Sequence, residues 1–317
     1  MIDIKEKITE KSRRFYNNEV APMIHDRFPD FETRIAVGIA GEGSDCFGYD
    51  DLISRDHDFG TGVCLWLTDK DYREIGNELA AAYDGLADAK AGAYYTDRLR
   101  ERRGVMTIHD FYSNILCVDC DTDNGTLSED KWYQVDHSCL ATAVNGEVFR
   151  DDLGVFSAFR NMLLHYYPEP VFRWRLADEL HRFSQALQVN YARCMTRKDT
   201  VAAELCRLQG IKAAMELFFL MKRKYPPYYK WTYRALREVD ETGEFSDLVK
   251  DLSETGCDLS AWEKVSYHPD SLNMEDRVVA LTEQIAGRIV KMMKEQGLVW
   301  EDDPYLERYV DVVLLRK

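Results

Sequence analysis

The chain has 317 residues and a formal net charge of −15. This length is enough to bury a core in one large or two ordinary domains, and we expect two. The acidic balance argues against nucleic acids or anionic membranes as general partners, because binding them needs a basic footprint. The eight cysteines are scattered, and neither an N-terminal apolar leader nor a membrane-length apolar run is visible. We therefore expect a reduced, cytoplasmic protein.

The first elements in chain order predict helix and strand in alternation. Residues 2–27 carry apolar side chains at helical spacing among many charges, which indicates an amphipathic helix ended by Pro29. The apolar runs 35–39 and 63–67 predict buried strands. After the second run, residues 68–71 have the pattern of a capping box that opens a helix through residue 82.

A similar alternation continues to about residue 150. Residues 105–108 have strand character, and an apolar-patterned helix is expected at 109–118. A short helix is expected at 138–143. The pair Asn145-Gly146 is a strong turn signal before a short strand at 147–149.

Beyond Gly154 the pattern changes to long segments with helical periodicity. In the segment 200–224, apolar residues from Val201 to Phe218 form one continuous stripe. We therefore predict an α+β protein: a mixed-sheet domain over residues 1–152, then an all-α helical bundle over residues 153–317. The expected helices of the second domain are 154–166, 171–196, 200–224, 228–239, 245–254 and 273–296.

The chemical signals gather between the first two strands. Gly43 and Ser44 follow the first strand and offer backbone N–H groups and a hydroxyl to a phosphate. Asp56 and Asp58 precede the second strand, and their i, i+2 spacing puts both carboxylates on one face of an extended segment. Such a pair is tolerated where a cation lies between the two charges. Metal and phosphate together indicate nucleotide chemistry.

Gly43-Ser44, an eleven-residue spacer and Asp56-His57-Asp58 resemble the signature of the nucleotidyltransferase superfamily that includes DNA polymerase beta. The resemblance extends to most of the chain. The stretches 145–151, 160–168 and 225–231, the last reading Tyr-Pro-Pro-Tyr-Tyr-Lys-Trp, are similar to a bacterial family of nucleotidyltransferase-like proteins described by the domain DUF4037.

The resemblance implies Mg²⁺-dependent transfer of a nucleoside monophosphate from a nucleoside triphosphate, with ATP as the expected donor, to a hydroxyl or amine of a small molecule. Asp56 and Asp58 would bind two Mg²⁺ ions, and Gly43 and Ser44 would hold the β- and γ-phosphates. The superfamily usually has a third carboxylate on a neighbouring strand. The matching strand here, 105–108, has none, and Asp110 just beyond it is the candidate.

Two cations of the second half are candidate phosphate ligands. Lys230 either places its ammonium on the triphosphate or covers the helical core with its stem. Arg193 shares a helix face with Arg197 and contacts either the triphosphate or surface carboxylates. Glu147 and Asp151 flank a turn and are candidates for the general base.

Two further groups are expected to be structural. The arginines between Arg98 and Arg103 predict a solvated helix face whose functional use would be to steer an anionic substrate. Trp174 and Trp231 are expected in the core.

Two alternatives to a small-molecule enzyme remain open. The absent strand carboxylate permits a nucleotide-binding protein without catalysis, which would serve regulation or assembly. A toxin-like transferase acting on tRNA or on a protein is the other alternative, and the acidic balance argues against tRNA.

Overall fold

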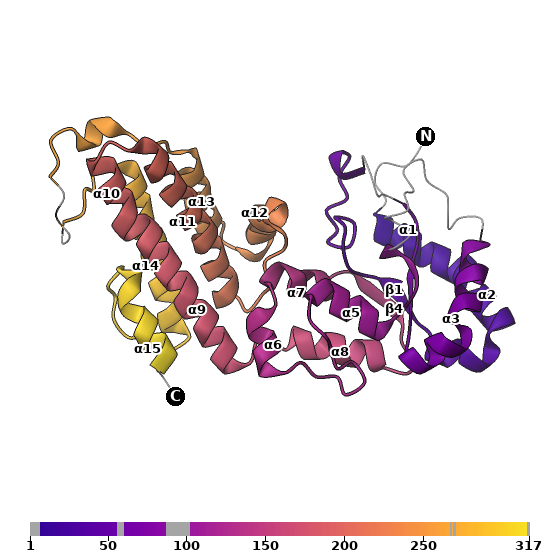
Figure 1. Ribbon diagram of the computed structural model, residues 1–317. Helices are drawn as coiled ribbons and strands as arrows, with labels where there is room; N and C mark the ends of the chain where they lie inside the picture. The colour runs from indigo at the N-terminus through magenta and orange to yellow at the C-terminus, as the bar shows by residue number, and fades with distance from the viewer. Residues whose placement is uncertain (1–6, 56–59, 87–101, 267, 269–270, 316–317) are drawn as a thin grey trace. The chain divides into compact units, whose positions relative to one another are not determined.

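The computed structural model describes residues 7–55, 60–86, 102–266, 268 and 271–315 (Figure 1). The fold is α+β, and its contacts divide the chain into two compact units, Met1–Tyr166 and Tyr167–Lys317. The boundary expected from the sequence, at residue 152, falls before helix α8 (Val155–Leu164), whereas the contacts group α8 with the first unit. Within the described part of the chain, no helix has the length and apolar character needed to cross a membrane.

A four-stranded mixed sheet forms the centre of the first unit. Its strands are β1 (Ala36–Ile39), β2 (Cys64–Leu67), β3 (Gly104–Thr107) and β4 (Glu147–Arg150), which confirms the expected strands. They are arranged in the order β3-β2-β1-β4. Strand β1 is antiparallel to both of its neighbours, and β2 is parallel to β3.

These strand directions bring four strand ends, the exit of β1 and the entries to β2, β3 and β4, to one edge of the sheet. Gly38 of β1 pairs with Cys64 of β2 and with Val148 of β4, and Cys64 in turn pairs with Gly104 of β3. The chain therefore leaves β1 where it enters the other three strands. We call this the loop edge: the residues that follow Ile39 and those that precede β2, β3 and β4.

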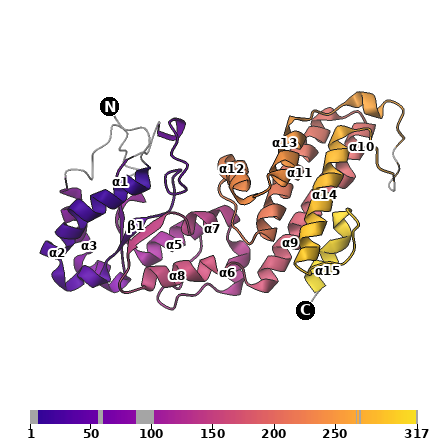
Figure 2. The ribbon, with the colours of Figure 1, turned by 180° about the vertical axis from the view of Figure 1, so that it is seen from behind.

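Helices cover both faces of this sheet (Figures 1 and 2). Val37 and Leu65 are paired across β1 and β2 and pack with Phe15, Ile24 and Leu79. On the other face, Trp66 stacks on Phe156 of α8 at 3.8 Å between ring centroids. The described α-helices of this unit are α1 (Ile8–Phe15), α2 (Ala21–Arg27), α3 (Asp69–Asp84), α5 (Ile108–Leu116), α6 (Glu129–Gln134), α7 (His137–Ala143) and α8.

Two helices of the first unit begin at a threonine cap, and the sequence predicted the first of these caps, at Thr68. The Thr68 hydroxyl accepts a hydrogen bond from the Asp71 amide at 3.2 Å at the start of α3. Thr107 does the same for the Asp110 amide at 2.8 Å at the start of α5. Each side chain satisfies an amide that has no partner within its helix, so a local pattern determines where both helices start.

The second unit is all-α in its described residues, as expected (Figure 2). The longest helix, α11, ends before Pro226-Pro227, and α14 ends before Gly297, whose φ is +67°. The α-helices are α9 (Glu169–Phe183), α10 (Tyr191–Thr196), α11 (Thr200–Met221), α12 (Tyr229–Val239), α13 (Glu244–Glu254), α14 (Arg277–Glu295) and α15 (Val310–Leu315). A π-helical turn, Ser184–Asn190, joins α9 to α10.

The expectation of one buried apolar stripe on α11 is wrong for its first half. Val201, Leu205 and Leu208 are 73%, 58% and 53% exposed. The buried residues of this half are Ala203, Arg207 and Gly210 instead. A β-carbon at Gly210 would lie 2.2 Å from Leu187 Cγ, so the helices approach too closely there for a larger residue. Trp174, which we expected in the core, is also exposed.

Helices α9 and α11 bring two buried glutamates together. The Glu179 and Glu216 side chains are 12% and 6% exposed. Burial and the neighbouring charge of Glu216 raise the pKa of Glu179 well above its ordinary value. Arg182 lies 3.5 Å from Glu179, and Lys212 pairs with Glu216 one helical turn away. The two carboxyl groups therefore retain a shared proton more readily than exposed glutamates do.

Candidate functional site

The turn after β1 needs glycine at two positions. Gly41 and Gly43 have φ values of +103° and +121°, in the region that disfavours other residues. A β-carbon at Gly43 would lie 2.3 Å from the Asp45 carboxylate. Ser44 follows, half-buried, and its carbonyl accepts a hydrogen bond from the Tyr49 amide at 2.8 Å. Gly43 and Ser44 thus lie in a tight turn at the loop edge.

A side chain from the start of β4 holds this turn in place. The Gly41 amide donates to Asn145 Oδ1 at 2.8 Å, and Asn145 Nδ2 donates to the Gly41 carbonyl at 2.8 Å. Asn145 therefore satisfies both backbone groups of Gly41 as a neighbouring strand would. The two residues are 104 positions apart in the sequence.

The turn that carries Asn145 is itself fixed from both sides. The Gly146 amide donates to the Cys46 carbonyl at 2.9 Å. Gly146 has a φ of +67°, and a β-carbon there would lie 2.0 Å from the Ile39 carbonyl oxygen. From α8, the Arg160 guanidinium donates to the carbonyls of Val144 and Asn145 at 2.5 and 3.1 Å. Asn145, Gly146 and Arg160 together hold the turn that contains Gly41 and Gly43, which we call the glycine turn.

A buried ion pair lies beside the same turn. Arg103 donates to Asp45 at 3.0 Å and to the Cys46 sulfur at 3.2 Å. The Arg103 and Asp45 side chains are 1% and 5% exposed. Burial opposes the Arg103 charge, but Cys46 and Asp45 outweigh it and raise the pKa of Arg103 above its ordinary value. The expectation that Arg103 lies on a solvated face is wrong, because the sheet places it against Asp45.

The paired carboxylates predicted to bind metal, Asp56 and Asp58, lie outside the described residues. The described residues that follow them, from Gly60 to Val63, enter β2 at the loop edge. This entry is fixed by the Val63 amide, which donates to the Tyr83 hydroxyl at 2.9 Å.

Asp110 belongs to the other edge of the sheet. It lies in the first turn of α5, after the C-terminal end of β3, whereas Gly43 and Ser44 follow the C-terminal end of β1, which runs in the opposite direction. Its carboxylate lies 3.5 Å from His109 Nδ1 and is 59% exposed. The strand directions therefore do not bring Asp110 to the glycine turn.

The two candidates for the general base have different surroundings. The Asp151 carboxylate accepts hydrogen bonds from the Gly154 and Ser157 amides at 2.9 and 2.7 Å, so it caps the start of α8. Glu147 begins β4 at the loop edge and pairs with Arg13 on the surface. Of the two, only Glu147 lies at the loop edge with a solvent-accessible carboxylate.

Lys230 and Arg193 belong to the second unit. The Lys230 ammonium lies 5.2 Å from the centre of the Trp231 ring. Arg193 donates to the Asn190 side chain at 3.5 Å. Both residues are exposed.

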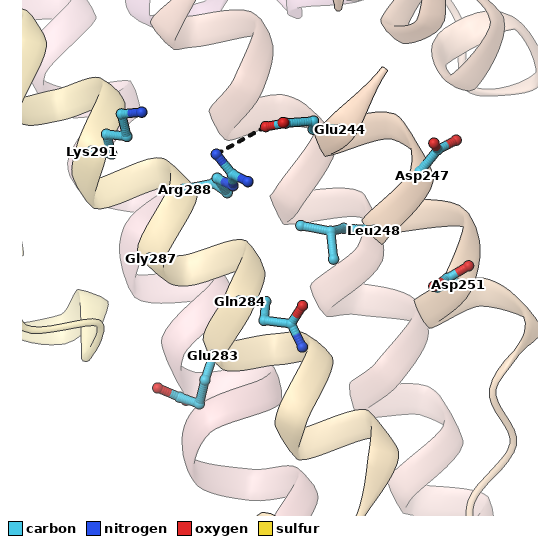
Figure 3. A pocket seen from close by; sticks show the side chains of 9 residues that line it. All are labelled: Glu244, Asp247, Leu248, Asp251, Glu283, Gln284, Gly287, Arg288 and Lys291. Atoms are coloured by element: carbon cyan, nitrogen blue, oxygen red, sulfur yellow. Dashed lines mark ion pairs between the residues drawn. The ribbon is translucent and has the colours of Figure 1, made fainter. Parts of the chain in front are cut away.

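A groove of about 540 Å³ lies between α13 and α14 in the second unit (Figure 3). Carboxylates of Glu244, Asp247 and Asp251 form one wall, and Arg288 and Lys291 contribute to the other. The Arg288–Glu244 ion pair crosses the groove at 2.9 Å. None of the predicted site residues lines this groove. Within the described ranges, no group of three or more His, Cys, Asp or Glu side chains is arranged to hold a metal ion.

Comparison with known proteins yields one match. No curated protein and no solved structure matches the chain. Residues 132–232 match the family described as "Domain of unknown function (DUF4037)". The matched segment contains Asn145, Gly146 and Arg160, which hold the glycine turn, and it ends just after the Tyr-Pro-Pro-Tyr-Tyr-Lys-Trp stretch. The similarity to DUF4037 inferred from the sequence is thus confirmed over residues 132–232.

Proposed function

We propose that this protein is a cytoplasmic nucleotidyltransferase that moves a nucleoside monophosphate from a nucleoside triphosphate, preferably ATP, to a hydroxyl or amine of a small-molecule acceptor, with release of pyrophosphate. The observation that carries the proposal is the convergence at the loop edge. A glycine turn after β1 lies beside the entry to β2, the strand that directly follows Asp56 and Asp58 in the sequence.

The turn itself supports a phosphate-binding role. The Gly41 and Cys46 amides are engaged by Asn145 and Asp45. The Gly43 and Ser44 amides, which lie between Gly41 and Cys46 in the sequence, are the proposed donors to the β- and γ-phosphates. Because Asn145 and the buried ion pair hold the turn in advance, little conformational entropy is lost when a phosphate binds.

Asp56 and Asp58 are the proposed ligands of two Mg²⁺ ions, which would neutralise charge on the transferring phosphoryl group. The described residues do not form a metal site by themselves, so metal binding would depend on Asp56 and Asp58. Lys230 and Arg193 remain proposed contacts of the triphosphate.

One observation favours the alternative of nucleotide binding without transfer. Strand β3 carries no carboxylate, and Asp110 belongs to the opposite edge. A site with only two carboxylates would hold a metal–nucleotide complex but would be poorly equipped to activate an acceptor.

The test is nucleotide transfer by the full chain. Wild type is incubated with Mg²⁺, triphosphates labelled at the α-phosphate and a metabolite extract, beside Asp58→Asn and, as a control with the same charge change on exposed α13, Asp247→Asn. We expect labelled products and pyrophosphate from wild type and control, and a loss of about 100-fold or more in Asp58→Asn. Asp110→Asn is expected to keep activity within about threefold.

Calorimetry with Mg²⁺ and ATP separates the two proposals. Binding that is lost in Asp58→Asn, without product from any acceptor, supports the protein that binds without transfer. Absence of binding for every triphosphate overturns both.

A further inference from the structure

One segment of the second unit has a charge opposite to that of the whole chain. Between Lys222 and Arg237 there are six basic residues, five aromatic residues and no acidic one, in a chain of net charge −15. The segment comprises the end of α11, the Pro226-Pro227 turn and α12. The net charge of the whole chain therefore does not reveal this local positive region, and the local charge of a surface affects what it binds.

The cations of this segment lie on the surface. Residues 222–224 are exposed, and so are Lys230, Arg234 and Arg237 on α12. On a helix, residues four apart share a face, so Lys230 and Arg234 form one row and Tyr229, Tyr233 and Arg237 a second row beside it. Figures 1 and 2 both show α12 standing out from the side of the bundle that contains α11 and α13.

Two neighbouring carboxylates pair with cations of this segment. Glu169 pairs with Arg223 at 3.7 Å, and Glu238 pairs with Arg234 at 3.6 Å. These two ion pairs involve Arg223 and Arg234, not Lys222, Lys230 or Arg237. We call the surface formed by Lys222, Tyr228, Tyr229, Lys230 and Arg237 the basic aromatic surface.

Two tyrosine rings are presented beside the cations. Tyr228 and Tyr229 are 48% and 73% exposed, with ring centroids 4.3 Å apart. The backbone that carries them is rigid: the Trp231 amide donates to the Tyr228 carbonyl at 2.8 Å, and the Thr232 hydroxyl donates to the Pro227 carbonyl at 2.9 Å. Exposed rings on a fixed backbone lose little entropy when a flat partner stacks on them.

We infer that the basic aromatic surface binds single-stranded nucleic acid, with phosphates against Lys222, Lys230 and Arg237 and unpaired bases stacked on Tyr228 and Tyr229. Positive charge interleaved with exposed aromatic rings is how proteins hold single strands without reading their sequence. A duplex offers no splayed bases to the rings. Helix α12 has 11 residues, a length of about 16 Å, which suits several nucleotides of one strand.

This inference goes beyond the proposed transfer reaction. The surface consists of residues of the second unit alone, and its test measures binding, not turnover. Lys230 is also a proposed contact of the triphosphate, whereas Asp58 belongs to the transfer site alone. Single-strand binding by Asp58→Asn that is unchanged from wild type would therefore separate the two roles.

The first measurement is fluorescence anisotropy of a labelled single-stranded RNA of about 12 nucleotides with the full chain. We expect binding at low salt that weakens as salt rises, with a slope of about −2 in log K against log salt for three phosphate contacts. Duplex RNA of the same sequence is expected to bind at least about tenfold more weakly.

Matched substitutions test the two components. Tyr229→Ala is expected to weaken binding at least about fivefold without changing the salt slope, because it removes stacking only. Lys230→Glu is expected to weaken binding about tenfold and to make the slope shallower. The controls Tyr305→Ala and Lys291→Glu change exposed residues of the same types elsewhere in the unit, and we expect them to stay within about twofold of wild type.

Several results would overturn the inference. These are no binding by the wild type, wild-type affinity in Tyr229→Ala, or a polyglutamate peptide that binds as tightly as the single strand. Equal affinity for ATP and for the strand would also overturn it, because the site would then be one nucleotide long. The melting temperature of each variant is measured as a control. If it equals that of the wild type, a loss of binding comes from the changed surface and not from unfolding.

Discussion

Each unit of this protein buries a pair of charged side chains, but the two pairs have opposite composition. In the first unit Arg103 faces Asp45, and each charge favours the other. In the second unit Glu179 faces Glu216, and each charge disfavours the other. The first pair is therefore held together by its ionised form, whereas the second depends on retaining a proton.

Burial alone therefore does not predict how a pair of charged side chains responds to mutation or pH. Removal of one partner from the opposite-charge pair leaves an uncompensated charge in the core. Removal of one charge from the like-charge pair relieves repulsion.

Asp45→Ala is expected to destabilise the first unit by about 3–5 kcal/mol, because Arg103 is left buried without its carboxylate. Chemical denaturation followed by tryptophan fluorescence measures the loss. The exposed Asp26→Ala is the matched control and should change stability by less than about 0.5 kcal/mol. The double variant Asp45→Leu with Arg103→Met should recover much of the loss, and a double variant as unstable as Asp45→Ala would contradict the argument.

Glu179→Gln is expected to stabilise the second unit at neutral and alkaline pH. The folded-state pKa of Glu179 is raised, so the folded state holds more protons than the unfolded state, and wild-type stability falls as pH rises from the ordinary range of a glutamic acid towards the raised pKa. The stability lost is about 1.4 kcal/mol for each pH unit by which the folded-state pKa of Glu179 is raised. Melting from about pH 5 to about pH 9 should show a decline in wild type that is reduced in the variant.

The decline with pH distinguishes the like-charge pair from its counterpart. Asp45→Ala should lower stability across the same pH range without introducing such a decline. A wild-type curve that rises over this range, or parallel curves for wild type and Glu179→Gln, would contradict the proton-sharing account.

Asn145→Ala is expected to destabilise the first unit by about 1–2 kcal/mol, because both backbone groups of Gly41 lose their partner. The variant asks whether the glycine turn is held by the Arg103 pair alone. If Asn145 contributes, hydrogen exchange of the amides around Gly41 should accelerate more than exchange in β2. Asn114→Ala, an exposed change on α5, is the control and should leave these amides as they are in wild type.

Lys212→Met is expected to have the smallest effect, under about 1 kcal/mol at neutral pH. The Lys212 side chain is 63% exposed, so its pairing with Glu216 is largely screened by solvent. Its loss should steepen the alkaline decline slightly, because the nearest cation on the Glu216 side is gone. A change larger than that of Asn145→Ala would mean that Lys212 neutralises the glutamate pair directly.

Local patterns predicted most elements of the fold. The four strands, the start of α3 and the helical second unit were readable because capping residues, turn signals and hydrophobic periodicity act over a few positions. The first half of α11 was misjudged for a physical reason. Its apolar residues are on the exposed side, whereas the packed side has Gly210 and Arg207, which hydrophobicity alone does not reveal.

The contacts at the candidate site were less predictable. The turn signal at Asn145-Gly146 was visible, but the bond from Asn145 to Gly41 joins residues far apart in the chain, and only the strand order brings them together. Arg103 was read with its arginine neighbours as a surface cluster, although it enters the core immediately before β3. Asp110 was chosen for its closeness to β3 in sequence, and strand direction places it at the other edge.

The position of β4 has a consequence for how the chain is made on the ribosome. Of the strands in the described residues, β4 is synthesised last, yet it pairs with β1, which is synthesised first. Until residues 145–160 have emerged, a nascent first unit exposes the unpaired side of β1 and lacks both Asn145 and Arg160, and exposed strand edges promote aggregation. Polypeptides truncated before residue 144 should therefore precipitate or recruit chaperones, and the glycine turn should acquire its final shape only late in translation.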